Sequence, residues 1–351
     1  MLNTVAHRRT TKQENALTFT TKNRAYIQAY LNQQIERFNS ALEDIEKRCS
    51  DLQESPDAIL QAVTNAFNDL AYACEEFERQ LAHDKAAIID AQVELREKTN
   101  ALLLKSYFIT RARTWPQGYP GDYKTLEDVY RNTPLSNGLG YYLDRYFLAT
   151  ELGVGVRERL ATLTGLLKGE LLNRTNPKVL NVACGSCREL VEVAPEVKQS
   201  GAQVTCIDFD PDALTFSANR LSYTGIEDDQ LVFRKYNAFK MISPERNLKE
   251  FGMQDIVYST GFYDYVEDDV LVRLLKSSYQ LLNPGGTLIA SFKDCRRYRT
   301  TDYHWFADWH GFLQRTEEEM WTLFDKAEIP RSALRTLRTK SEVINFFVAT
   351  K

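Results

Sequence analysis

A turn of small residues, followed by an acid about 20 positions later, is the most chemically informative feature of this sequence. The apolar run Lys178–Val182 stops at the small-residue turn Ala183–Cys187, and a second apolar run ends at Asp208. In a parallel sheet, such a turn lets the backbone approach a nucleoside, and the acid accepts hydrogen bonds from ribose hydroxyls. The spacing therefore predicts an adenosine-containing ligand, with four residues beside it: Ala183, Gly185, Asp208 and Phe209.

The residues of the turn also discriminate between adenosine cofactors. A dinucleotide fingerprint needs glycine at its first, third and sixth positions, which here are Ala183, Gly185 and Arg188. No Gly-Lys-Ser/Thr sequence follows, which argues against a phosphate-binding loop. S-adenosylmethionine carries no phosphate and needs only a tight turn with one or two small residues. The turn therefore favours S-adenosylmethionine, and a parallel-sheet turn without a ligand is the alternative.

Cys184 and Cys187 form a Cys-X-X-Cys pair inside this turn, a spacing that zinc and redox sites also use. The remaining four cysteines are scattered, and none of them makes a second close pair: Cys49, Cys74, Cys206 and Cys295. The sequence therefore favours a role for these two cysteines as small residues that fill the turn, and we expect no metal.

Further candidate residues follow other apolar runs of the C-terminal half. Residues 231–233 and 255–258 read as strands, and residues 282–290 read as a helix end, a Pro-Gly-Gly turn and a strand. A short polar side chain after the first run can meet the adenine edge, and polar residues after the second can face a sulfonium. The residues predicted for these places are Asn237 and Ala238 at the adenine, and Ser259, Thr260 and Tyr263 at the sulfonium, with Ser259 and Tyr263 as catalytic candidates.

A tyrosine-rich stretch precedes these runs. Pro120-Gly121 suits the central positions of a type II turn, and aromatic rings near a sulfonium gain about 0.5–2 kcal/mol of cation–π energy. We expect this stretch to form a lid over the ligand, and a plain turn with packed tyrosines is the alternative. The candidates are Tyr119 and Tyr123 for the cofactor, Asp122 as a catalytic orienter, and Tyr142 for the substrate.

The elements that position these residues begin with a helical domain over residues 1–113. No glycine precedes Gly118, and Pro56 is the only proline between Met1 and Trp115. This composition predicts a helical cap. The expected helices cover residues 22–50, 56–82 and 85–113, and residues 1–20 are expected to be frayed.

Residues 114–175 are predicted to be a linker and lid segment, and residues 176–351 an α/β domain. Strand-like and helix-like runs alternate through this last part, which predicts a doubly wound, Rossmann-like sheet of seven strands. Thr316-Glu317-Glu318-Glu319 is a capping box that opens a helix to about residue 327. Two β-rich runs at 333–339 and 342–350 fit a closing antiparallel hairpin.

The landmarks over residues 176–351 resemble those of class I S-adenosylmethionine-dependent methyltransferases. This resemblance implies that the cofactor is S-adenosylmethionine. Asn181 stands where an acid is common in that family, and Ala183 and Cys187 replace glycines. The aminobutyrate end of the cofactor is therefore expected to be held differently.

Four segments resemble a narrower bacterial subfamily, the extracellular-factor 3-hydroxypalmitic acid methyl ester biosynthesis proteins. The resemblance implies a helical cap and a small acyl or acid substrate, with Trp309 and Arg315 shaping the acceptor end; a surface ion pair is the alternative for Arg315. The architecture is also similar to the azetidine-2-carboxylate synthases, which use the methyl donor as substrate. The segments are Gly118–Tyr123, Leu143–Leu148, Ser259–Tyr265, and Asp308-Trp309 with Gln314–Thr316.

Two reactions fit these residues. In methyl transfer the protein mainly aligns the reactants, and a carboxylate acceptor, with a pKa of about 4, arrives ionised and needs no base. The chain has four histidines, His7, His83, His304 and His310, and this scarcity favours such an acceptor. In the alternative, the α-amine of S-adenosylmethionine attacks its own γ-carbon, giving azetidine-2-carboxylate and methylthioadenosine. A regulatory S-adenosylmethionine-binding protein without turnover is a third hypothesis.

Composition limits the partners. The net charge is −4 and there is no basic tract, so nucleic acid is not an expected substrate. No apolar run approaches the roughly 18 residues of a membrane span. The cysteine usage and the absence of a signal peptide fit a reduced cytoplasm. The long helical N-terminal region is a candidate surface for a homodimer.

Overall fold

The computed structural model describes residues 3–49, 54–309 and 311–351, and these form two compact units. The helical unit comprises Met1–Thr114, Pro134–Phe147 and Thr300–Asp308. The sheet unit comprises Trp115–Thr133, Leu148–Arg299 and Trp309–Lys351. The chain first leaves the helical unit beside the boundary predicted at residue 113, but it returns twice, so neither unit is one continuous segment. The predicted linker is divided between the two, and His310 lies outside the described residues.

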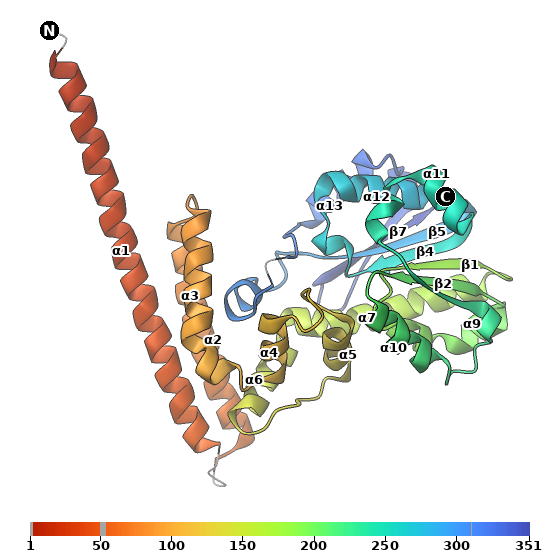
Figure 1. Cartoon of the computed structure of the whole chain (residues 1–351), viewed down its shortest axis with the longest axis horizontal. Coiled ribbons are helices and arrows are strands. Elements are labelled where there is room, and N and C mark those ends of the chain that lie inside the picture. The colour runs from red at the N-terminus through yellow and green to blue at the C-terminus, as the bar shows by residue number, and fades with distance from the viewer. Residues whose placement is uncertain (1–2, 50–53, 310) are drawn as a thin grey trace. The chain divides into compact units, whose positions relative to one another are not determined.

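The helical unit is built on long helices, as its lack of glycine predicts. Its first helix begins at Asn3, so the segment that we expected to be frayed is helical from residue 3 onward. Figure 1 shows this helix running past the ends of its two long neighbours. The helices are α1 (Asn3–Arg48), α2 (Pro56–Gln80), α3 (Lys85–Leu103), α4 (Tyr107–Thr114), most of α6 (Leu139–Ala149) and the short η4 (Asp302–Phe306).

The predicted helix over residues 85–113 is in fact two helices, α3 and α4. Ser106 lies at the break, where its hydroxyl oxygen accepts a hydrogen bond from the Ile109 amide and donates to Asp144 Oδ1 at 2.6 Å. Serine competes for helical backbone groups in this way, and a capping serine starts a new helix. The partner Asp144 comes from α6, so the break depends on a contact between segments far apart in sequence.

The core of the helical unit joins all three of its chain segments. The predicted apolar face of α2 is buried through Ile59, Val63 and Phe67. The Phe67 ring stacks on Tyr146 of α6 at 4.1 Å, and the Trp305 indole donates to Glu78 at 2.7 Å. Segments that return late in the chain therefore complete this core.

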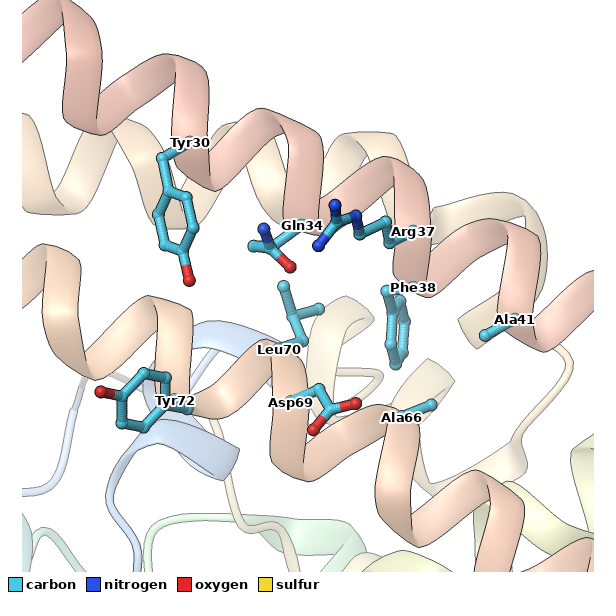
Figure 2. A pocket seen from close by; sticks show the side chains of 9 residues that line it. All are labelled: Tyr30, Gln34, Arg37, Phe38, Ala41, Ala66, Asp69, Leu70 and Tyr72. Atoms are coloured by element: carbon cyan, nitrogen blue, oxygen red, sulfur yellow. The ribbon is translucent and has the colours of Figure 1, made fainter.

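A cavity of about 320 Å³ opens between α1 and α2 in the helical unit. Figure 2 shows that α1 and α2 both contribute side chains, some apolar and some charged. No residue predicted for the site lines this cavity. Its lining residues are Tyr30, Gln34, Arg37, Phe38, Ala41, Ala66, Asp69, Leu70 and Tyr72.

The sheet unit contains one seven-stranded sheet with the order β3-β2-β1-β4-β5-β7-β6. The first five strands are parallel, and β7 pairs antiparallel with both β5 and β6. This confirms the predicted doubly wound sheet with its closing hairpin. The strands are β1 (Lys178–Val182), β2 (Gln203–Asp208), β3 (Leu231–Lys235), β4 (Gln254–Thr260), β5 (Leu282–Lys293), β6 (Leu334–Arg338) and β7 (Ile344–Thr350).

Helices cover both faces of this sheet (Figure 1). The predicted capping box is present at the start of α13, where Thr316 and Glu319 exchange hydrogen bonds. Within the described residues, every helix is too short or too polar to span a lipid bilayer. The remaining elements are α5 (Tyr123–Arg131), α7 (Glu151–Leu172), α8 (Arg188–Glu192), α9 (Ala194–Ser200), α10 (Pro211–Leu221), α11 (Pro244–Phe251), α12 (Asp268–Gln280) and the short turns of helix η1 (Asp228–Gln230), η2 (Ala238–Ile242), η3 (Tyr263–Tyr265) and η5 (Arg331–Ala333).

Candidate active site

The small-residue turn after β1 is unusually tight. Ala183, Gly185 and Cys187 all have positive φ, at 54°, 54° and 47°. Side chains other than glycine pay about 1–2 kcal/mol for this conformation, so two of the three positions are strained. Hydrogen bonds fix the strained turn: the Cys184 amide donates to the Ile207 carbonyl at 3.0 Å, and the Ser217 hydroxyl donates to the Gly185 carbonyl at 2.7 Å.

Asp208 ends β2 directly beside this turn. Its Oδ2 accepts from the Gly185 amide at 2.9 Å, and its Oδ1 accepts from the Asp210 amide at 3.0 Å. Burial raises the pKa of Asp208. Asp210 caps α10 by accepting from the Asp212 amide. Asp208 therefore supports the turn, and each of its oxygens keeps lone pairs for a ligand.

The lid segment, Gly118–Tyr123, lies at the carboxyl edge of the sheet. The Tyr119 hydroxyl donates to Asp210 Oδ2 at 2.8 Å, and the Tyr119 ring is 5.0 Å from that of Phe209. A Cβ built on Gly121 would lie 2.7 Å from the Tyr265 hydroxyl, and one built on Gly185 would lie 4.0 Å from Tyr123 Cβ. The segment thus contacts the loops after β1, β2 and β4.

Three residues predicted to be catalytic have other contacts in the structure. Ser259 is 0% exposed and donates to the Val182 carbonyl at 2.8 Å, between β4 and β1. Tyr263 is 1% exposed within an apolar cluster, and burial raises its pKa to about 12. Asp122 is buried and caps α5, accepting from the Lys124 and Thr125 amides. None of these three presents itself as a general base.

The predicted adenine-side residues lie at the same edge of the sheet. Asn237 follows β3, where its Oδ1 accepts from the Phe239 amide at 3.0 Å, and its side chain is exposed. Ala238 is buried next to it, and Thr260 is the last residue of β4. Their contact with a cofactor stays a prediction.

The residues predicted for the acceptor end are distributed over both units. Arg315 is buried and pairs with Asp268 at 2.8 Å while donating to the Tyr263 and Val266 carbonyls, so it forms an ion pair that supports a loop. Trp309 packs against Phe312, with ring centroids 6.1 Å apart. Tyr142 belongs to the helical unit, where it packs beside that unit's core.

Two buried cations at the sheet edge were missed by the sequence reasoning. Arg159 of α7 is 4% exposed, and its Nη2 donates to the Tyr130 hydroxyl at 3.2 Å. Its Nη1 lies against Gly261, the residue after β4, where a built Cβ would be only 2.8 Å away. Lys293 ends β5. A detectable signal existed for Arg159, because it interrupts an otherwise apolar buried stripe of α7.

The two cations differ in how they are compensated. Lys293 Nζ pairs with Asp264 Oδ2 at 2.9 Å and lies 4.1 Å from the centre of the Phe312 ring. Burial lowers the pKa of Lys293. Among the residues that the structure describes, no carboxylate forms an ion pair with Arg159. The cluster therefore carries two buried cations and one buried acid.

A buried acid lies beneath the turn. Glu189 Oε1 accepts from Asn181 Nδ2 and from the Tyr258 hydroxyl, both at 2.9 Å. Burial raises its pKa to about 8, and the negative Cys187 beside it acts in the same direction. The acid that the sequence seemed to lack at Asn181 is thus supplied eight residues later, in contact with Asn181.

Comparison with known proteins agrees with this geometry. A family model described as a methyltransferase domain matches residues 180–288, which span β1 through most of β5. No curated protein matches the sequence. The matched segment is similar to a methyltransferase domain. The seven-stranded sheet that contains it has an α/β, Rossmann-like fold.

One solved structure with a TM-score above 0.5 shows the same fold, and others share part of it with lower scores. A possible exported protein from Bordetella parapertussis is similar over 92% of this chain and 96% of its own, with a TM-score of 0.53 and 17% identity. Magnesium protoporphyrin IX methyltransferase from Synechocystis, solved with bound S-adenosylmethionine, is similar over 57% of this chain and 82% of its own (TM-score 0.41, 13% identity). An O-methyltransferase family protein from Burkholderia thailandensis covers 57% and 59% (TM-score 0.43, 14% identity). The first similarity extends well beyond the segment that the family model matches.

Proposed function

We propose that this protein transfers the methyl group of S-adenosylmethionine to the carboxylate of a small acid or acyl compound. The observation that carries the proposal is Arg159, a buried guanidinium without an ion pair beside the end of β4. Asp264 also acts on the Arg159 charge, but its carboxylate is already paired with Lys293. A buried charge that lacks a paired acid of its own costs several kcal/mol. The carboxylate of a substrate would pair with it through a charge-assisted hydrogen bond to one of its oxygens.

The chemistry requires no proton transfer. A lone pair of the carboxylate oxygen attacks the methyl carbon, the carbon–sulfur bond breaks, and its electrons remain on sulfur. The products are a methyl ester and S-adenosylhomocysteine. Lack of a base is consistent with the three predicted catalytic residues, because Ser259 and Asp122 have other hydrogen-bond partners and Tyr263 is buried in an apolar cluster. One acceptor oxygen on Arg159 would leave the other free to react, so positioning supplies the rate enhancement.

Cyclisation of the cofactor is the alternative that the same cation permits. Arg159 would then hold the carboxylate of S-adenosylmethionine itself, while its α-amine displaces methylthioadenosine. The nucleoside product separates these reactions. Incubation with S-adenosylmethionine alone should leave it intact, and addition of carboxylic acids of increasing chain length should yield S-adenosylhomocysteine. Methylthioadenosine formed without any acceptor would instead establish cyclisation. Binding without either product across the acids would favour a regulatory protein.

The role of Arg159 has its own test. Arg159→Gln should raise the KM of the acid acceptor at least about tenfold, because a buried charge pair contributes about 2–5 kcal/mol when truncated. The Kd of S-adenosylmethionine, measured by calorimetry, should change little. Lys168→Gln, at a half-buried position of the same helix where the charge already pairs with Glu196, is the matched control. If the Arg159 variant bound S-adenosylmethionine more weakly while the acceptor KM stayed unchanged, Arg159 would be assigned to cofactor binding instead.

A further inference from the structure

Three cysteine sulfurs meet beneath the small-residue turn. Cys184 and Cys187 come from the turn, and Cys206 comes from the neighbouring strand β2. Their sulfur atoms all lie within 4.8 Å of one another, and those of Cys187 and Cys206 are 3.7 Å apart. The sequence could not show this cluster, because the third thiol arrives through the parallel pairing of β1 with β2.

The spacing of the sulfurs suits a metal ion. With metal–sulfur bonds of about 2.3 Å and bond angles between tetrahedral and trigonal, ligand sulfurs lie about 3.8–4.0 Å apart. The closest pair in the cluster is already near this value. The sulfurs are held there by the backbone: the Cys184 amide donates to Ile207, and the Cys187 amide donates to the Cys184 carbonyl at 3.1 Å. A metal would therefore enter a largely preformed site.

The ligand set favours one class of ion. Within the described part of the chain, the group contains three thiols and no fourth histidine, cysteine or carboxylate ligand. Structural zinc is almost always four-coordinate, whereas soft thiolates also select Cu(I). Asn181 Nδ2 donates a hydrogen bond to the Cys187 sulfur at 3.8 Å, which orients one ligand within the cluster.

We propose that Cys184, Cys187 and Cys206 form a three-coordinate site for a thiophilic ion, Cu(I), beneath the cofactor-binding turn. As metal–sulfur bonds form, the ligating thiols release their protons to solvent. Cys184 is 8% exposed while the other two are fully buried, so entry is from the Cys184 side. Because Gly185 lies between two of the ligands, a bound ion would fix the turn whose Gly185 amide contacts Asp208. The site does not depend on which acceptor the enzyme uses.

The test uses the full-length protein, reduced and kept under anaerobic conditions. Cu(I) is titrated in competition with bicinchoninate, a chromogenic Cu(I) chelator. The wild type should withdraw one equivalent of Cu(I), and its thermal midpoint should rise by on the order of 5 °C at a hundredfold excess over Kd. Cys206→Ala should lose this equivalent and the shift. Cys295→Ala, a half-buried cysteine outside the cluster, should retain both.

Other outcomes would overturn the proposal. These are no Cu(I) withdrawn by the wild type, an unchanged equivalent in Cys206→Ala, or its loss in Cys295→Ala. X-ray absorption of the loaded wild type gives the ligand set independently of how the variants fold, and it should show three sulfurs on the copper. Stoichiometric Zn(II) binding by the same cysteines, with no Cu(I) binding, would refute the three-coordinate assignment.

Discussion

Asp208 is the residue that we predict to hold the ribose of the cofactor at the sheet edge. It is placed at the end of β2 with its Oδ2 on the Gly185 amide. Asp208→Ala should weaken S-adenosylmethionine binding at least about tenfold, which corresponds to about 1.4 kcal/mol. Calorimetry measures the change, and circular dichroism verifies that the fold is retained. Asp212→Ala, an exposed acid nearby, should bind normally. Unchanged affinity of the Asp208 variant would refute the ribose assignment.

Glu189 should make the stability of the protein depend on pH. Burial disfavours the charged form and raises the pKa of Glu189 from the ordinary glutamate value of 4.5 to about 8. Between these values the folded state binds more protons than the unfolded state, so stability is greatest at low pH and falls as pH rises toward 8. The slope from this group is at most about 1.4 kcal/mol per pH unit.

Glu189→Gln should remove that contribution, because glutamine keeps the shape without titrating. The measurement is the free energy of unfolding in urea from about pH 5 to pH 8 for both proteins, and the difference between the two profiles is the readout. Glu192→Gln, a nearby acid in a surface ion pair, should follow the wild type. Parallel profiles for wild type and Glu189→Gln would show that Glu189 is ionised throughout.

At the residue scale, the roles of individual side chains depend on contacts that the sequence does not give. Asp208 does end a strand beside the turn, as its spacing predicts, because strand ends are local features. Ser259 was misjudged because alternation along β4 does not reveal which face is covered, and its hydroxyl is used by Val182. Arg159 lies against Gly261 because α7 packs on the sheet edge, and no spacing in the sequence predicts that packing.

At the scale of elements, the lid segment offers a prediction with a built-in control. Gly121 and Gly118 both have positive φ, at 71° and 80°, so alanine at either position costs about 1 kcal/mol in backbone strain. Only at Gly121 would the new Cβ meet a neighbour, the Tyr265 hydroxyl at 2.7 Å. Gly121→Ala should therefore lower kcat/KM several-fold more than Gly118→Ala, because it displaces the lid.

A second variant isolates this steric effect from the strain. Tyr265→Phe removes the hydroxyl that the added methyl group would meet. In a Tyr265→Phe background, Gly121→Ala should therefore lower the activity much less than it does in the wild type. Steady-state kinetics on the four proteins gives the coupling between the two positions. If the effects of the two substitutions on kcat/KM simply add, the position of the lid segment does not depend on Tyr265.

Elements that are defined by local chemistry were predictable from the sequence. The capping box at Thr316 and the alternation of strands and helices specify their own structure through neighbouring residues. The break between α3 and α4 was not predictable, because Ser106 interrupts the helix only with Asp144 as its partner. Similarly, the frayed segment expected before residue 20 is helical, which shows how weakly polarity alone argues against a long helix.

At the scale of the whole molecule, the helical unit is discontinuous in sequence. Apolar periodicity identifies helices but cannot show that residues 134–147 and 300–308 return to the N-terminal core. The homodimer expected through the helical region stays a prediction. The lengths of two helices are consistent with it. Helix α1 has 46 residues and α2 has 25, so α2 cannot cover α1 along its full length (Figure 1).

The discontinuous helical unit predicts that the N-terminal helices are required for folding. Removal of residues 1–114 would uncover Tyr146, Trp305 and Phe306, whose partners include Phe67 and Phe77 of α2. Each large buried side chain contributes about 1.5–3 kcal/mol, so together they rival the total stability of a domain. This truncated protein should therefore aggregate or lose cooperative unfolding.

Removal of residues 1–20 is the matched control, since the described core of the helical unit begins at Ile27. That shorter variant should remain folded and bind S-adenosylmethionine with unchanged affinity. Soluble yield, thermal unfolding and calorimetry compare the two truncations. If the protein without residues 1–114 unfolds cooperatively and binds the cofactor, then the returning segments do not need the N-terminal helices, and the helical unit is an accessory to an independent methyltransferase domain.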